Sequence, residues 1–265
     1  MAGTVVHLLA AEKLLAKLGR ENWSYPFQGM PEFYPDYFIA GNICPDGIMA
    51  RQGYQRDMKL HTHFRDGIPD GSFEKEGMAQ LFEKRMMRFW QEHEPDEREC
   101  PGLYLGYVTH MMTDERFILQ ERPKFFQNIS VIGLTQKDAE TFVRFNKETD
   151  FVDFQLLREY PELQEAKKAL ERVPAYEVKG MITKEELTAS RKWILDYFFE
   201  QEHTEETAQF LEYDSMVQFI EDVVEEIFKR LSEHVRDLNE MAGVYSSTEK
   251  EITAMAEDLP SDVII

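Results

Sequence analysis

Cysteine is scarce in this sequence: Cys44 and Cys100 are the only two, which excludes a disulfide framework and indicates free thiols in a reducing compartment. Long apolar runs are also lacking, so we expect no membrane-spanning helix and no stable membrane insertion. Residues 1–6 place no basic segment ahead of an apolar stretch, which argues against a signal peptide. These absences together predict a cytoplasmic protein.

Basic residues are few relative to acidic ones, with 30 Lys and Arg against 50 Asp and Glu and a formal net charge of −20. Nucleic acids require clustered Lys and Arg side chains, so we expect no nucleic-acid partner. Docking on anionic membranes is disfavoured for the same reason. Hydrophobic residues make up 43% of the chain, which is enough to form a core. We therefore expect a folded protein, whose oligomeric state is left open.

Strand patterns, repeats and low-complexity segments are absent as well, whereas apolar residues recur at helical spacing along most of the chain. We expect an all-α fold, with a single multi-helix domain over residues 1–245 and an acidic C-terminal tail over 246–265. A stretch broken by prolines and glycines, 22–54, leaves room only for a short helix over 36–40. The other helices are expected over 4–19, 73–92, 104–119, 135–156, 161–173, 183–200 and 215–243.

One apolar segment, 104–117, carries two ionisable residues four positions apart, His110 and Asp114. In a helix this spacing puts the imidazole and the carboxylate side by side on one face. Burying a charge is costly unless it is paired or bound to a metal ion. The two residues therefore form either a hydrogen-bonded packing pair or part of a metal site. Gly106, one turn earlier on the same face, leaves space where another chain segment or a ligand could approach closely.

Three more ionisable residues have constrained settings. His7 falls on the core face of the first helix, Asp46 lies on an expected tight turn, and His63 lies in an expected loop close to His61. Each alone is explained by core packing, by a turn aspartate that bonds its own backbone, or by an exposed loop histidine. Together with the helix pair they give two or three imidazoles and two carboxylates, a plausible set for zinc or another divalent transition metal. The predicted metal ligands are therefore His7, Asp46, His63, His110 and Asp114.

Four motifs occur in order along residues 1–155. They are His7 in a leading helix, Gly-Asn-Ile-Cys-Pro-Asp over 41–46, Thr-His-Phe over 62–64, and a His-x-x-x-Asp helix preceded by Gly-Tyr over 105–114. In this order they resemble the zinc-dependent phospholipase C family. The resemblance implies an all-helical domain in which these histidines and aspartates bind zinc.

The chain also departs from that family. It has no histidine between His110 and His203, where secreted members carry further ligands, so we expect one or two ions and not three. In this interpretation Asp114 bridges a first ion to a second one held by His7. Six residues precede His7, so the N-terminus, which binds zinc in that family, is not expected to reach the ions. The relatives that fit best are intracellular bacterial proteins of unassigned substrate.

The resemblance implies a metal-dependent hydrolase, most simply a phosphoesterase that uses a metal-activated water on a small or lipid-like phosphoester. We assign catalytic roles to Asp46, Asp153 and Glu148, the last two as candidates to complete the second ion site or to act as general base. The aromatic run 23–38 is expected to wall the substrate pocket, although core packing explains it equally well.

Two alternatives use the same residues differently. In the first, the chain is a catalytically inactive relative with a structural metal ion or a His–Asp hydrogen-bond network, and its acidic surface binds a protein partner. A closed four-coordinate site would favour this alternative. In the second, the His-x-His motif over 61–63 resembles the one that ends the first strand of metal-dependent barrel hydrolases. That fold needs alternating strands and helices, which this sequence lacks.

Overall fold

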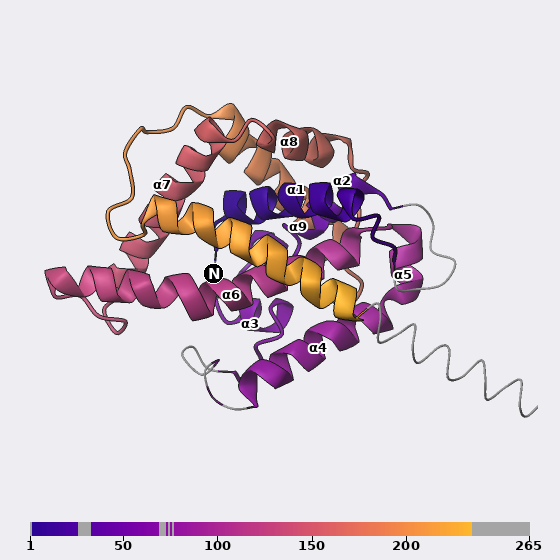
Figure 1. Cartoon of the computed structure of the whole chain (residues 1–265), viewed down its shortest axis with the longest axis horizontal. Coiled ribbons are helices and arrows are strands. Elements are labelled where there is room, and N and C mark those ends of the chain that lie inside the picture. Colours follow the sequence, from indigo (N-terminus) through magenta and orange to yellow (C-terminus); the bar gives the residue numbers. More distant parts are fainter. Residues whose placement is uncertain (1, 26–32, 69–72, 74, 76, 235–265) are drawn as a thin grey trace, which may run out of the picture.

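Among the described residues the longest helix is α6 (Leu103–Ile129), which runs through the middle of the fold (Figure 1). The computed structural model describes residues 2–25, 33–68, 73, 75 and 77–234. Among these residues all elements are helical apart from an isolated bridge between Val178 and Ile182, which confirms the predicted all-α class. The expected tail 246–265 and the expected helix end near 243 lie outside the described residues.

Every residue of α6 from Leu103 to Glu115 is buried, as expected for a helix that is enclosed by other helices. The prediction that this helix ends near 119 is wrong, because it continues through Pro123 to Ile129. A proline within a helix removes one backbone hydrogen bond. Tertiary packing offsets that loss here, since Phe125 and Ile129 are fully buried in the core.

α2 (Pro35–Gly41) crosses α6 with the two backbones in direct contact at Gly41 and Gly106. A Cβ built on Gly106 would lie 2.9 Å from the Gly41 Cα and closer still to the Phe38 carbonyl oxygen. The space predicted beside Gly106 is thus filled by another chain segment. This contact fixes the end of α2, and with it Asn42, against the middle of the central helix.

α1 (Thr4–Arg20) begins where the sequence predicts, but Gly3 is its N-cap and provides no side-chain bond. The cap comes instead from Asp153 on α7 (Ala139–Glu159), whose carboxylate accepts the backbone N–H groups of Val5 and Val6 at 3.2 and 3.3 Å. A side chain at residue 3 would collide with this carboxylate. The start of α1, and therefore the position of His7, is set by a helix far along the chain.

The elements that carry Asp46 and His63 differ from the prediction. Asp46 belongs to a short 3-10 helix, η1 (Pro45–Ala50), and not to an isolated turn. His63 is buried at the C-cap of α3 (Met58–Thr62), where a loop is predicted. Its N–H donates to the Lys59 carbonyl at 3.0 Å, which closes the last turn of α3.

Further helices enclose this centre. Thr183 and Glu186 form a capping box at the start of α9 (Lys184–Ile194), within the helix predicted over 183–200. The segment predicted as a loop after 94 forms α5 (Glu94–Glu99), and α7 begins later than predicted. Also present are α4 (Met78–Glu92), which likewise begins later than predicted, η2 (Ser130–Ile132), α8 (Leu163–Arg172) and η3 (Leu195–Glu200).

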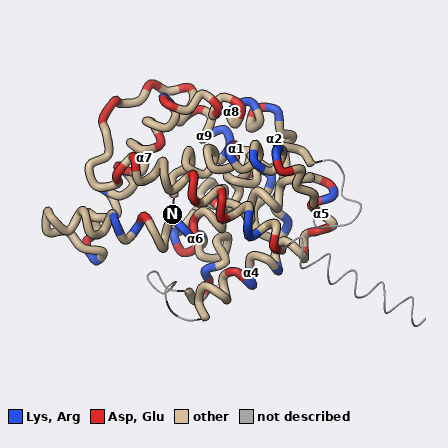
Figure 2. Tube along the Cα trace, viewed as in Figure 1, with Lys and Arg blue, Asp and Glu red and all other residues tan. Residues whose placement is uncertain are grey.

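A long helix over 213–234, orange in Figure 1, lies alongside α1. Ion pairs join the two helices from Lys13 to Glu221 and from Lys17 to Glu225, each at 2.8 Å. Charged residues of both signs are spread over the helices that surround the core (Figure 2). No helix among the described residues is both long and apolar enough to cross a bilayer.

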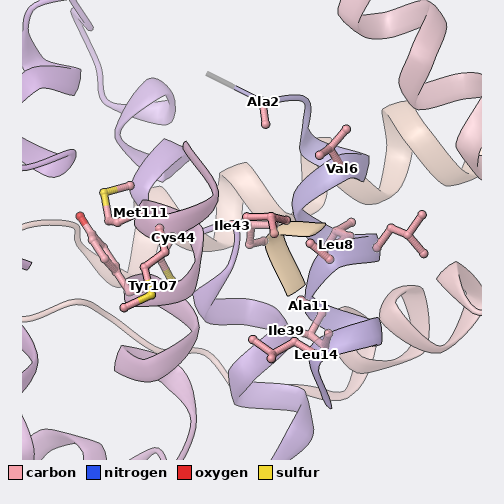
Figure 3. Packing of buried hydrophobic residues seen from close by; sticks show 14 of the residues in the cluster. Ala2, Val6, Leu8, Ala11, Leu14, Ile39, Ile43, Cys44, Tyr107 and Met111 are labelled. Carbon is pink, nitrogen blue, oxygen red and sulfur yellow. The ribbon is translucent and has the colours of Figure 1, made fainter. Parts of the chain in front are cut away.

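The core between α1, α2 and α6 is apolar. Leu8, Ala11 and Leu14 of α1 lie close to Ile39 and Ile43, and each of these side chains is at most 3% exposed (Figure 3). Apolar contacts of this kind hold α1 against the centre of the molecule. His7 lies on the same helix face, so it is a polar side chain in apolar surroundings.

Candidate metal centre

The structure brings the five predicted metal ligands together at one buried point between α1, η1, α3 and α6. Asp114 lies in the middle: its Oδ1 is 3.3 Å from His7 Nε2, and its Oδ2 is 3.6 Å from His110 Nε2 and 3.7 Å from His63 Nε2. Asp46 Oδ1 lies 3.2 Å from His63 Nε2. The His7 and His110 rings stack with their centroids 3.7 Å apart. An isolated packing pair of His110 and Asp114 does not describe this arrangement.

Backbone carbonyls fix the orientation of two of these imidazoles. His110 Nδ1–H donates to the Asn42 carbonyl at 2.7 Å, and His63 Nδ1–H donates to the Lys59 carbonyl at 2.9 Å. A carbonyl oxygen can only accept, so the proton resides on Nδ1 and the Nε2 lone pair faces the carboxylates. Metal-binding histidines are commonly held in this way.

Several of the atoms that face one another have no hydrogen-bond partner among the described residues. They are buried ring nitrogens and a carboxylate oxygen: His7 Nδ1 and Nε2, His63 Nε2, His110 Nε2 and Asp114 Oδ2. A lone pair that points at a carboxylate repels it, and buried polar atoms without partners are costly. A cation among these atoms would remove both costs. The groups His7–His110–Asp114 and Asp46–His63–His110 could each hold a metal ion.

The two groups share His110, and this sharing limits how they can fill. Nδ1 of His110 is already bonded to a backbone carbonyl, so a single Nε2 lone pair serves both groups. Two ions would therefore divide the ligands, with His110 on one of them. Asp114 presents Oδ1 to His7 and Oδ2 to the other two histidines, which is compatible with the bridging role predicted for it.

Burial favours the neutral form of two of the histidines. It lowers the pKa of His7 to about 4, with a further contribution from the neighbouring His110 ring, and it also lowers the pKa of His63. Burial alone would raise the pKa of the two aspartates. Lys59 nevertheless holds the pKa of Asp46 well below its usual range. Neutral imidazoles and ionised carboxylates are the protonation states that bind metal ions.

The segment before α1 contacts the cluster through a backbone amide, while the expectation that the N-terminus does not bind the ions falls on residue 1, which lies outside the described residues. Ala2 N–H donates to Asp114 Oδ1 at 2.9 Å, where the bonds from Asp153 to α1 hold the start of the chain. No sequence pattern marks this contact, because it uses a backbone group that every residue except proline possesses.

Two further positioning residues, Asn42 and Lys59, are not among the predicted site residues. The Asn42 side chain accepts a hydrogen bond from the Thr109 hydroxyl at 3.1 Å, which holds its carbonyl over His110. Lys59 Nζ lies 2.5 Å from Asp46 Oδ1. Asn42 stands within the 41–46 motif and could have been recognised there, whereas nothing local to Lys59 indicates its role.

The structure does not bring the other three candidates into the cluster. Glu148 Oε2 accepts the backbone N–H groups of residues 209–211 at 2.6 to 3.2 Å, so it caps that segment. Asp153 caps α1, and burial raises its pKa to about 8. His61 is exposed and bonds to Asp66 at 2.8 Å.

A cavity of about 850 Å³ lies beside the cluster. Among the five candidate ligands only His63 lines it, and Asp153 and residues 2–4 form part of the same wall. The described residues of the aromatic run 23–38 do not line it, so the prediction that they wall the pocket is wrong for them, and residues 26–32 lie outside the described residues. The aromatic lining comes from other segments: Tyr54, Phe126, Phe142, Phe145, Trp193 and Phe198.

Three imidazoles and two carboxylates around one buried point suit a divalent transition metal, and the adjoining cavity is large enough for a small molecule. The resemblance to the zinc-dependent phospholipase C family rests on the four sequence motifs and stays a prediction. No protein-family model, curated protein or solved structure matches this chain.

Proposed function

We propose that this chain is a metal-dependent phosphoesterase that holds one or two zinc ions, or another divalent transition metal, in the cluster of His7, Asp46, His63, His110 and Asp114. One observation carries the proposal: buried imidazole nitrogens and a carboxylate oxygen face one another without hydrogen-bond partners among the described residues. A cation would satisfy these atoms together. The resemblance to zinc-dependent phospholipases C supports a phosphoester, small or lipid-like, as the substrate.

A divalent ion bound in such a cluster lowers the pKa of a coordinated water and offsets negative charge on phosphoryl oxygens. The residues of the chain supply orientation, since the carbonyls of Asn42 and Lys59 hold two of the rings and His63 brings the cluster to the cavity wall. Asp153 lines the same cavity, but the backbone N–H groups of Val5 and Val6 occupy its carboxylate, so it is left out of the chemistry. Glu148 is left out, because backbone N–H groups occupy its carboxylate.

Metal analysis of the purified protein tests this function. The protein is expected to contain zinc or a similar ion, and His110→Ala is expected to lose both the ion and the hydrolysis of a panel of phosphoesters. His61→Ala is the matched control, because this exposed histidine bonds only to Asp66 among the described residues and should leave both properties unchanged. Normal hydrolysis by metal-free protein in the presence of a chelator would end the proposal.

A second candidate is a structural metal site in an inactive protein that binds a protein partner. The enclosure of the cluster favours it, because four of the five candidate ligands do not line the cavity. A closed four-coordinate ion, with no hydrolysis of any phosphoester by metal-loaded protein, would support this candidate. A water ligand on the ion that faces the cavity would count against it.

A further inference from the structure

The cavity beside His63 gathers basic side chains, although the protein carries a formal net charge of −20. The acidic residues of its lining are Asp57, Asp150 and Asp153, and the carboxylate of Asp153 is occupied by the backbone N–H groups of Val5 and Val6. An acidic protein that concentrates positive charge around a cavity is expected to bind an anion there. The basic residues of the lining are Arg56, Lys59, Arg65 and Arg122.

Arg56 is an exposed cation held over an aromatic ring. Its guanidinium carbon lies 4.8 Å from the centroid of the Phe142 ring. No carboxylate pairs with it in the part of the chain that the structure describes. A guanidinium over a ring face keeps its N–H edge available for a planar, two-point bond to phosphate oxygens. Arg56 therefore presents its charge in the form that best recognises a phosphate group.

Lys59 follows one helical turn after Arg56, and its backbone N–H donates to the Arg56 carbonyl at 3.3 Å. Its ammonium contacts Asp46 of the metal cluster, while its side chain also lines the cavity. The two cations thus come from one turn of chain immediately before His63. An anion that lies against His63 would be adjacent to both.

Aromatic side chains form another part of the lining. Two of them already carry a guanidinium over one face: Phe142 that of Arg56, and Phe126 that of Arg122 at 5.4 Å. A quaternary ammonium headgroup would meet these guanidinium groups and be repelled. An uncharged aromatic ring would instead bury apolar surface against the wall. The remaining aromatic lining residues on this side are Phe145, Trp193 and Phe198.

We propose that this cavity binds a phosphomonoester of an aromatic alcohol, and that Arg56 and Lys59 select a dianionic phosphate over a zwitterionic phosphocholine group. The inference rests on the proposed function in taking the phosphate to lie against His63. The cavity volume of about 850 Å³ falls in the range of pockets that enclose molecules of this size.

Calorimetric titration of the full-length, zinc-loaded protein with phenylphosphonate, methylphosphonate and phosphocholine tests the inference. Phenylphosphonate is expected to bind at least about 10-fold more tightly than either of the others, because only it combines a dianion with a ring that buries apolar surface. Arg56→Met is expected to weaken that binding by about 10-fold without changing the zinc content. Arg20→Met is the matched control, since this exposed arginine lies at the far end of α1 from the cavity.

Equal affinities for phenylphosphonate and methylphosphonate, or unchanged binding in Arg56→Met, would overturn the inference. The same titration in the presence of a chelator tests this inference separately from the proposed function. A protein that takes up no zinc, yet binds phenylphosphonate through Arg56, loses the proposed function and keeps this assignment of the cavity. A protein that holds zinc and hydrolyses phosphoesters, but does not discriminate among the three probes, keeps the proposed function and loses this assignment.

Discussion

Glu97 and Asp114 are both buried carboxylates that contact α6, but their surroundings differ. Glu97 accepts the Tyr25 hydroxyl at 2.7 Å and two backbone N–H groups at the start of α6 at 2.7 and 2.9 Å. Asp114 accepts one backbone N–H, from Ala2, and otherwise faces the nitrogens of three histidines. Donors of the fold saturate the first carboxylate, whereas the second has a single backbone donor and faces the Nε2 lone pairs of His63 and His110.

Three other acids divide in the same way. Glu148 and Asp153 accept backbone N–H groups at the ends of distant segments, as Glu97 does. Asp46 resembles Asp114 in facing a histidine Nε2, although Lys59 also pairs with it. Burial of a carboxylate therefore does not mark a site in this protein. What distinguishes the site is that histidine nitrogens without hydrogen-bond partners face its carboxylates.

Replacing Asp114 should give the largest effect. Asp114→Asn is expected to lower zinc affinity by more than about 100-fold, because even residues outside the first ligand shell contribute about 10- to 100-fold. Competition with a chromogenic chelator measures the change. Zinc affinity near that of the wild type would show that zinc binds elsewhere. Asp114 would then be a structural carboxylate like Glu97.

Replacing Glu97 should affect stability and spare the metal. Glu97→Ala is expected to reduce the free energy of unfolding by roughly 3 kcal/mol, because buried donors at the start of α6 lose a charged acceptor. Urea denaturation measures this loss, and Glu97→Gln, which keeps an acceptor oxygen, should lose less. If folded Glu97→Ala lost its zinc, the two kinds of carboxylate could not be separated.

The glycine contact between α2 and α6 fixes the position of Asn42, whose carbonyl orients His110 in the cluster. Gly106→Ala is expected to cost about 2 kcal/mol of stability, since the added methyl group forces the two helices apart. It should also weaken zinc binding, because Asn42 would move away from His110. Gly19→Ala is the control: its Cβ would meet no atom within 4 Å, so the change should be neutral or stabilising. Equal effects of the two substitutions would contradict this account.

The pH dependence of stability should show the smallest effect. Burial raises the pKa of Asp153 from 3.8 to about 8, so the folded state binds more protons than the unfolded state between these values. Stability contributed by this group is therefore present at low pH and is lost as pH rises through about 8. Between pH 7 and 8 the loss should be about 1 kcal/mol. Asp153→Asn should remove this slope in denaturation curves measured in a chelator, and an unchanged slope would assign it to another group.

Much of the site could be predicted because its signals are local or rest on residue type. The four-residue spacing of His110 and Asp114 places both on one helix face, and the core position of His7 follows from helical periodicity. The all-α class follows from the same periodicity. These predictions need no knowledge of how the helices pack.

The rest depends on contacts between distant segments, which no local pattern encodes. Pro123 indicates a helix end, but burial of the residues beyond it keeps α6 intact. Glu148 and Asp153 look alike as acids on a half-buried helix, yet their backbone partners lie 61 and 148 residues away. The cavity wall is assembled from several segments, so the aromatic run 23–38 gave a misleading signal.

The single lone pair that His110 offers to both ligand groups has a consequence for metal loading. The first equivalent of zinc would take this nitrogen, and a second equivalent would find one donor fewer. A stepwise titration should therefore show either one endpoint or two of unequal strength, with the weaker ion stripped first by a mild chelator. Zinc-to-protein ratios measured after purification would then depend on how the sample had been dialysed.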